Sequence, residues 1–149
     1  MHTRYIPLLV LSAALAFACG PRAHSGEGSA HSKGTPGQPV ATSLDVRVDQ
    51  GVLFALRVTN KASKSLELTF PDGQTHDIVV LDGGGREVWR WSQGRMFTQA
   101  LQNRVLARSE TVSYEGQWLP SDNHGTFTAV ASLRSENHPI EQRIQFTLP

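Results

Sequence analysis

Apolar and polar residues alternate with a period of two from Leu44 to the C-terminus. The segments Leu44–Val48, Val52–Val58 and Leu66–Phe70 each place apolar side chains at every second position. Such alternation is typical of half-buried β-strands, because successive side chains of a strand point to opposite faces of its sheet. No stretch of this region carries the apolar stripe of an amphipathic helix. The pattern therefore predicts an all-β fold.

Turn signals rich in glycine, proline and aspartate separate the alternating segments, as at Pro71–Gln74 and Asp82–Gly85. Further strands are predicted over His76–Leu81, Glu87–Trp91, Val105–Leu106, Thr111–Tyr114, Phe127–Leu133 and Arg143–Leu148. Short strands at near-regular spacing predict a single immunoglobulin-like antiparallel β-sandwich of about seven or eight strands. Its predicted core consists of Val46, Val48, Phe54, Leu56, Val58, Leu66, Leu68, Phe70, Ile78, Val80, Val88, Tyr114, Phe127, Ala129, Ala131, Ile144 and Phe146.

Residues 1–18 have the pattern of an export signal. A positive charge precedes the apolar segment Ile6–Ala18, which is too short for a membrane span of about 20 residues. Ala16-Phe17-Ala18 is a small-x-small cleavage signal, and the single cysteine of the chain, Cys19, follows it. The segment Leu15–Cys19 resembles a bacterial lipoprotein signal, which implies that Cys19 is lipidated. The alternative is an ordinary secreted, soluble protein.

Residues 19–43 are predicted to be a flexible tether behind the lipidated cysteine. Half of residues 20–43 are Gly, Pro or Ser, a composition that cannot bury a core. The residue after the cysteine is Gly20 and not Asp. In this respect the chain resembles lipoproteins of Gram-negative bacteria that are sent on to the outer membrane. We therefore expect an exported cell-envelope protein that meets the membrane through a lipid anchor and carries its folded domain at 44–149.

Charge and cysteine content narrow the possible partners. The chain has 14 basic and 13 acidic residues, a formal net charge of +1, and the two signs are mixed along the folded part. A protein that binds nucleic acid would show a basic face or block, so no nucleic-acid partner is expected. One cysteine excludes an intrachain disulfide and a cysteine-based zinc cluster.

The sequence also argues against an enzyme. It contains no G-x-S-x-G elbow, and Gly83–Gly85 lacks the lysine of a phosphate-binding loop. His76 and Asp77 are neighbours on a predicted strand, so they point to opposite faces and cannot act together. Asp122 and His124 lie in a polar loop, where a solvated turn is the default interpretation. No catalytic residue, metal or other cofactor is predicted.

Several segments, taken in order, resemble the BsuPI family, which is named for an intracellular proteinase inhibitor of Bacillus. The most specific pair is Val88-Trp89-Arg90-Trp91-Ser92 followed by Phe97-Thr98-Gln99-Ala100-Leu101. The supporting segments are Val58–Asn60, Leu66–Gln74, Asp77–Val80, Gly85–Glu87, Glu110, Tyr114, Trp118 and Gly125–Phe127. The resemblance covers residues 44–149 and implies an immunoglobulin-like β fold. It also implies inhibition of a subtilisin-type serine protease, here in an exported, lipid-anchored form.

A substrate-like inhibitor needs an exposed, rigid loop that offers a side chain to the primary pocket of the protease. Subtilisin-type pockets accept large apolar side chains, so Ser92–Leu101 is the best candidate loop, with Met96, Phe97, Gln99 and Leu101 as its candidate contact residues. Alternatively, Phe97 and Leu101 tuck under the sandwich as a plug. Leu119–Gly125 is a second, weaker candidate.

A non-inhibitory protein-interaction domain of the envelope is the second functional hypothesis. Trp89 and Trp91 share one strand face and could form a partner-binding surface, although a tryptophan on a sandwich strand is more often part of the core. Trp118 has the same two interpretations. The sequence does not indicate the oligomeric state.

Overall fold

The computed structural model describes residues 38–149. The predicted signal peptide, Cys19 and the tether up to residue 37 lie outside the described residues. The described part is all β, with nine strands and no helix. The strands are β1 (Val40–Val48), β2 (Val52–Asn60), β3 (Leu66–Phe70), β4 (His76–Leu81), β5 (Glu87–Arg90), β6 (Gln102–Leu106), β7 (Thr111–Trp118), β8 (Gly125–Leu133) and β9 (Ile140–Leu148).

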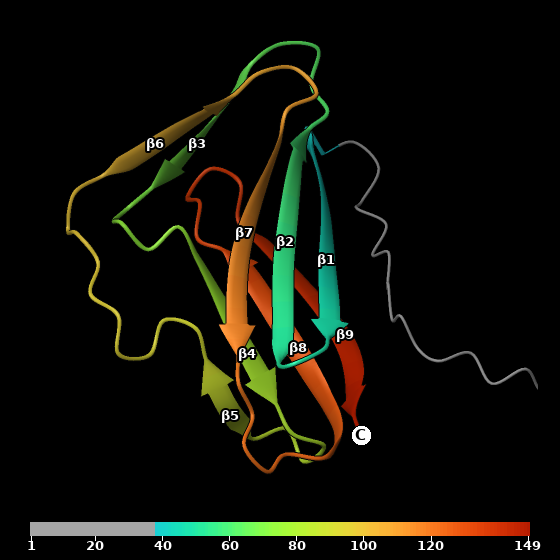
Figure 1. Ribbon diagram of the computed structural model, residues 1–149. Coiled ribbons are helices and arrows are strands. Elements are labelled where there is room, and N and C mark those ends of the chain that lie inside the picture. Colours follow the sequence, from blue (N-terminus) through green and yellow to red (C-terminus); the bar gives the residue numbers. More distant parts are fainter. Residues whose placement is uncertain (1–37) are drawn as a thin grey trace, which may run out of the picture.

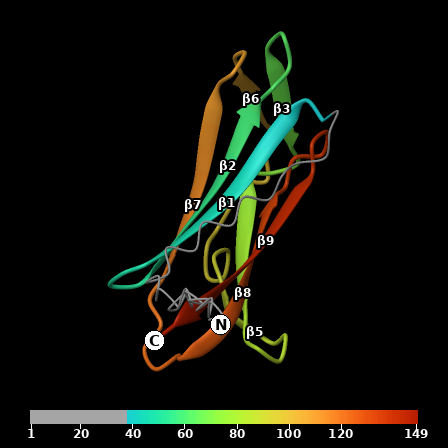
Figure 2. The same ribbon diagram turned by 90° about the vertical axis from the view of Figure 1, so that its right-hand side faces the viewer.

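Two antiparallel sheets face each other across the core, which confirms the predicted sandwich. One has the strand order β1-β2-β7 and the other the order β5-β4-β8-β9. Figure 1 shows the first sheet in front of the second, and Figure 2 shows the two layers from the side. The layers meet at β1 and β9, where the Gln142 amide donates to the Thr42 hydroxyl over 2.7 Å.

Strands β3 and β6 form a separate two-stranded sheet at one end of the sandwich (Figure 1). Leu68, Phe70 and Leu106 point inward from this small sheet and are fully or almost fully buried. The Asn137 side chain ties β3 to the chain after β8, because it accepts from the Thr69 N–H and donates to the Glu67 carbonyl. The small sheet therefore closes the core at this end.

Asn60 holds the end of β2 to the turn between β6 and β7. It is completely buried, and its amide nitrogen donates to the carbonyls of Lys64, Leu106 and Ala107. Its side-chain oxygen accepts from the Ala62 N–H at 2.8 Å. A buried side-chain amide is tolerated where its donors and acceptor are satisfied, as they are here.

The core is largely the predicted one, and an aromatic cluster joins its two sheets. The Phe54 ring stacks on Trp89 with centroids 5.7 Å apart, and Trp118 meets the Phe127 ring at 5.5 Å. Trp118 is only 5% exposed, so its core interpretation is the right one. Buried apolar side chains beyond the predicted set are Val40, Leu44, Val52, Leu106, Trp118, Leu133 and Leu148.

Four details differ from the expectations. β1 begins at Val40, so the folded domain starts before residue 44 and residues 40–43 do not belong to a tether. Nine strands form where about seven or eight were expected, and two of them, β3 and β6, form a small sheet of their own. Val48 is 43% exposed, because it ends β1 at the hairpin. Val88 is 38% exposed, because the neighbouring Trp89 takes the inward face of β5.

Within residues 38–149, no helix is long and apolar enough to cross a membrane.

Candidate functional site: the anchored loop between β5 and β6

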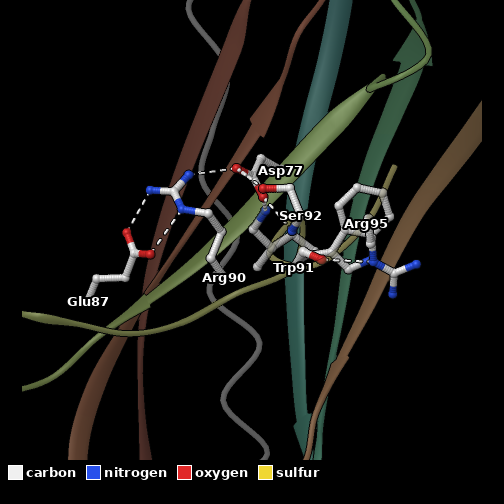
Figure 3. Close-up of polar contacts among 7 residues, drawn as sticks. Asp77, Glu87, Arg90, Trp91, Ser92 and Arg95 are labelled. Atoms are coloured by element: carbon white, nitrogen blue, oxygen red, sulfur yellow. Dashed lines mark hydrogen bonds and ion pairs between the residues drawn. The ribbon is translucent and has the colours of Figure 1, made fainter. Parts of the chain in front are cut away.

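A buried carboxylate fixes the start of the loop that follows β5. Asp77, on β4, is 5% exposed and accepts four hydrogen bonds. Its Oδ1 accepts from the N–H groups of Ile78 and Ser92, at 2.9 and 3.2 Å. Its Oδ2 accepts from the Arg90 guanidinium at 2.6 Å and the Ser92 hydroxyl at 3.0 Å (Figure 3). One side chain thus joins β4, the end of β5 and the first residues of the loop.

Arg90 extends this anchor to a second carboxylate. Its guanidinium donates to both oxygens of Glu87, at 3.0 and 2.6 Å, in addition to Asp77 (Figure 3). These bonds lower the pKa of Glu87 and raise the pKa of Arg90, because each favours the charged form of the group. The arginine therefore stays charged and holds β5 in place from its exposed side.

Trp91 continues inward from the same strand end. Its backbone N–H donates to the Ile78 carbonyl at 2.8 Å. The centre of its indole ring lies 4.0 Å from the centre of the His76 imidazole. Gly116 on β7 permits this approach, because a Cβ there would lie 3.0 Å from Trp91 and 2.9 Å from Ile78. The indole thus reaches the edge of the opposite sheet.

His76 lies beneath Trp91 and is 7% exposed. Its Nε2 lies 3.2 Å from the Glu115 carbonyl, which can only accept, so Nε2 carries a proton. Its Nδ1 lies 3.2 Å from the Thr75 hydroxyl, which donates to the neutral ring. Burial lowers the pKa of His76, because the charged imidazolium would lose its hydration among the aromatic rings.

Two loop residues close over Trp91. The Arg95 guanidinium carbon lies 4.4 Å from the centre of the indole, and its Nε donates to the Trp91 carbonyl at 2.8 Å (Figure 3). The Phe97 ring is partly buried and lies 5.7 Å from the same indole. Met96 stands between these two residues in the chain. Met96 is 98% exposed and forms the tip of the loop.

The far side of the loop rests on the turn between β3 and β4. The Gly73 N–H donates to the Thr98 carbonyl at 2.8 Å. A Cβ at Gly73 would lie 2.6 Å from the Thr98 hydroxyl and 3.1 Å from its backbone nitrogen, so only glycine permits this contact. At the start of the loop, the backbone N–H of Arg95 donates to the Ser92 carbonyl and closes a turn. Gly94 in this turn has a φ of 75°. Both flanks of Met96 are therefore fixed.

The other predicted loop residues have mixed positions. Gln99 is exposed, and Leu101 is 70% exposed, so the plug interpretation fails for Leu101 and holds in part for Phe97. In the second candidate segment, Leu119 is 67% exposed and its side chain lies beside Gly51.

Trp89 and Trp91, predicted as a candidate partner-binding face, do share one face of their strand. Both are partly buried and packed against the core. Arg95 and Phe97 lie on Trp91, and Phe54 lies on Trp89. The pair therefore supports the loop from within and does not present a bare aromatic surface.

A shallow hollow of about 410 Å³ adjoins the loop. Trp91 and Arg95 line one side of it, and Leu53 and Ala55 on the outer face of β2 line its floor. The ion pair between Arg57 and Asp45 lies at its rim. The surface at Trp91 and Arg95 is therefore concave, and both apolar and charged groups line it.

Among the described residues, no three His, Cys, Asp or Glu side chains are grouped closely enough to hold a metal ion. His124 contacts the carbonyl of Pro149 with its Nδ1, so it serves to hold the C-terminus. His76 and Asp77 face opposite sides of β4, as expected, and each has its own partners.

The sequence analysis selected this loop as a candidate and did not predict its anchor. Asp77 stands next to the apolar run Ile78–Leu81, and a carboxylate bordering a buried strand needs donors. Arg90 and Ser92 supply them from the segment V-W-R-W-S. The unusual position of Asp77 was the available signal.

Comparison with known proteins identifies a family. The family model described as an intracellular proteinase inhibitor, BsuPI, matches residues 40–138. A search of curated proteins finds no match to the chain. Among solved structures, the crystal structure of a protein designated ApaA from Bordetella pertussis is 19% identical and covers 74% of this chain and 92% of its own, with a TM-score of 0.41.

Replacing Asp77 by alanine should loosen the loop and destabilise the domain. The substitution breaks the ion pair between Asp77 and Arg90 and leaves the N–H groups of Ile78 and Ser92 and the Ser92 hydroxyl without their acceptor. We expect the free energy of unfolding to fall by about 2–3 kcal/mol. The value stays below that of a fully buried pair because the Arg90 side chain is 39% exposed. Urea unfolding measures the loss, and limited proteolysis should show faster cleavage between residues 93 and 99.

The matched control is Glu141→Ala, which breaks the exposed pair with Arg143. It should change stability by less than about 0.5 kcal/mol. Equal losses in the two variants would contradict the anchoring role of Asp77.

His76 should make stability depend on pH. Its folded pKa lies below the unfolded value of about 6.5, so the unfolded chain binds the proton first as pH falls. The charged groups that act on it are Asp77, which favours protonation, and Arg95, which opposes it. The stabilisation is therefore complete above about pH 7 and decreases as pH falls from about 6.5 through the folded pKa.

Urea unfolding from pH 5 to pH 8 checks this dependence, with His76→Gln expected to flatten the slope. The exposed His124, changed to Gln, controls for the loss of a surface histidine. An unchanged slope in His76→Gln would overturn the assignment to His76.

Proposed function

The chain belongs to the BsuPI family of intracellular proteinase inhibitors, a non-enzymatic family, and from that premise we propose that it inhibits a subtilisin-type serine protease by presenting Met96 to the primary pocket. Inhibition is reversible occlusion of the active site. The observation that carries this proposal is the exposure of Met96 between two residues that are fixed on Trp91. Gln99 and Leu101 extend the contact on the far side of the loop.

The physical reason is preorganisation. A flexible loop would lose conformational entropy when it is held in the protease cleft, and this loss would weaken binding. Here the Asp77 anchor, the Trp91 platform and the Gly73–Thr98 hydrogen bond restrict the loop before the partner arrives. A protease of this class accepts a large, unbranched apolar side chain in its pocket, and Met96 is such a side chain.

We further propose that the protein acts in the cell envelope. The signal over residues 1–18 and the position of Cys19 support an exported lipoprotein, of the outer membrane if the bacterium is Gram-negative. The folded domain would then meet proteases outside the cytoplasm, with the chain before Val40 as its tether.

A second candidate function is a non-inhibitory interaction domain, which the free edge of β7 favours. The Asn60 N–H bonds the Glu110 carbonyl, so even-numbered residues of β7 face β2 and odd-numbered residues face away. β7 is an edge strand of its sheet, so the outward backbone groups of Ser113 and Gln117 have no neighbouring strand among the described residues. An extended segment of another protein could pair with this edge.

Titration of subtilisin with the purified protein tests inhibition. We expect stoichiometric loss of protease activity with the inhibitor recovered largely intact, and any slow cleavage located beside Met96 by mass spectrometry. Met96→Asp should weaken inhibition at least roughly 100-fold, because it places a charge in an apolar pocket. Val105→Asp changes another exposed apolar residue, 60% exposed on β6, and should inhibit like the unaltered protein.

Full protease activity at equimolar protein, with no complex detected, would contradict the inhibitory proposal. Crosslinking from Ser113 and Gln117, each replaced by a photoreactive residue, would then test the β7 edge. Equal weakening by Met96→Asp and Val105→Asp would keep the inhibitory function and reject Met96 as the pocket residue.

Cys19→Ser tests the lipid anchor. The unaltered protein, expressed in a bacterium with its signal intact, should sediment with the envelope, dissolve in detergent and incorporate an alkyne-tagged fatty acid. The variant should lose the label and leave the membrane fraction, because serine offers no thiol for the lipid. A soluble, unlabelled parent protein would instead support ordinary secretion.

A further inference from the structure

Met96 is the only sulfur-containing residue between Gly20 and the C-terminus. The chain has two methionines and one cysteine, and the others are Met1 and Cys19. The Met96 side chain is 98% exposed, the highest value among the exposed large apolar side chains of the described residues. A thioether in this position is fully open to small oxidants in solution.

The chemistry is a two-electron oxidation of the thioether. A peroxide transfers one oxygen atom to the sulfur, its O–O bond breaks, and with hydrogen peroxide the second oxygen leaves as water. The product is methionine sulfoxide, a polar and chiral side chain of nearly the same length. Reduction by a dithiol through a sulfoxide reductase reverses the step, with the two thiols becoming a disulfide and the oxygen leaving as water.

Oxidation at this point should leave the fold intact. Met96 contributes no buried surface, and the residues that fix the loop hold one another through Trp91 without it. The indoles are less accessible: Trp118 is buried, and Trp89 and Trp91 are partly buried. Mild peroxide therefore has one preferred target in the described part of the chain.

The same oxidation should act strongly on a bound complex. A sulfoxide oxygen in an apolar pocket loses its hydration and finds no hydrogen-bond donor there, which disfavours binding. The side chain that is neutral for stability is thus the one on which partner binding depends.

We propose that Met96 is a redox modification site, at which a peroxide switches the protein's protease binding off and a sulfoxide reductase switches it on. The proposal rests on the proposed inhibitory function and specifies how that site is regulated.

The test treats the full-length protein with hydrogen peroxide and then titrates it against subtilisin. Tryptic digestion releases Met96–Arg104 as a separate peptide, so its 16-dalton mass increase can be followed independently of Met1. We expect inhibition to weaken at least about tenfold in step with oxidation of this peptide. The unfolding midpoint in urea should not change, and treatment with a methionine sulfoxide reductase should restore inhibition.

Met96→Leu is the matched control, because it keeps an apolar side chain of similar size and removes the sulfur. The comparison is made within the variant: its inhibition, whatever its strength before peroxide, should be unchanged after peroxide. Undiminished inhibition by the oxidised parent would overturn the switch and leave the inhibitory function standing. A loss of inhibition shared by the treated Met96→Leu variant would assign the effect to another residue and also overturn the switch. Absence of inhibition before any treatment would reject the inhibitory function, and the switch with it.

Discussion

The Asp77 carboxylate is the contact on which the loop geometry depends. A charged group that is 5% exposed is tolerated only if donors replace its lost hydration, and Asp77 has four of them. Two of these donors belong to Ser92, the first residue after Trp91. Satisfying the carboxylate therefore requires the chain to leave β5 in one direction. The cost of burying the charge is offset only when the loop starts correctly.

The loop is next stabilised by the core that lies beneath it. Trp91 can lie against the opposite sheet because Gly116 has no side chain in its way, and His76 fills the space beside the indole. Arg95 and Phe97 then use the exposed part of this ring as their support. The two neighbours of Met96 in the chain, Arg95 and Phe97, are supported on the indole, whereas the Met96 side chain is 98% exposed.

The strands could be predicted because their alternating pattern is a local property of the sequence. Predictions were wrong where burial or pairing depends on residues far apart in the chain. The alternation identified most strands, and it placed Trp89 and Trp91 on one face with Val88 on the other. Assigning Val88 to the core was inconsistent with that, since only one face of the edge strand β5 meets the opposite sheet. The start of β1 at Val40 was missed because polar Thr42 and Ser43 hide the pattern, although pairing with β2 fixes their register. The loop residues were predicted as a group, and only the support on Trp91 distinguishes exposed Met96 from half-buried Phe97.

The same arrangement separates stability from recognition. Asp77, Arg90 and Trp91 carry the fold of the loop, while Met96 contributes nothing to it. Under the proposed function, a change at the tip would therefore alter partner binding without altering the stability of the domain, whereas a change at the anchor would alter both. The segment V-W-R-W-S thus specifies how the tip is held, because Arg90 and Ser92 bond the Asp77 carboxylate and Trp91 supports the residues on either side of Met96.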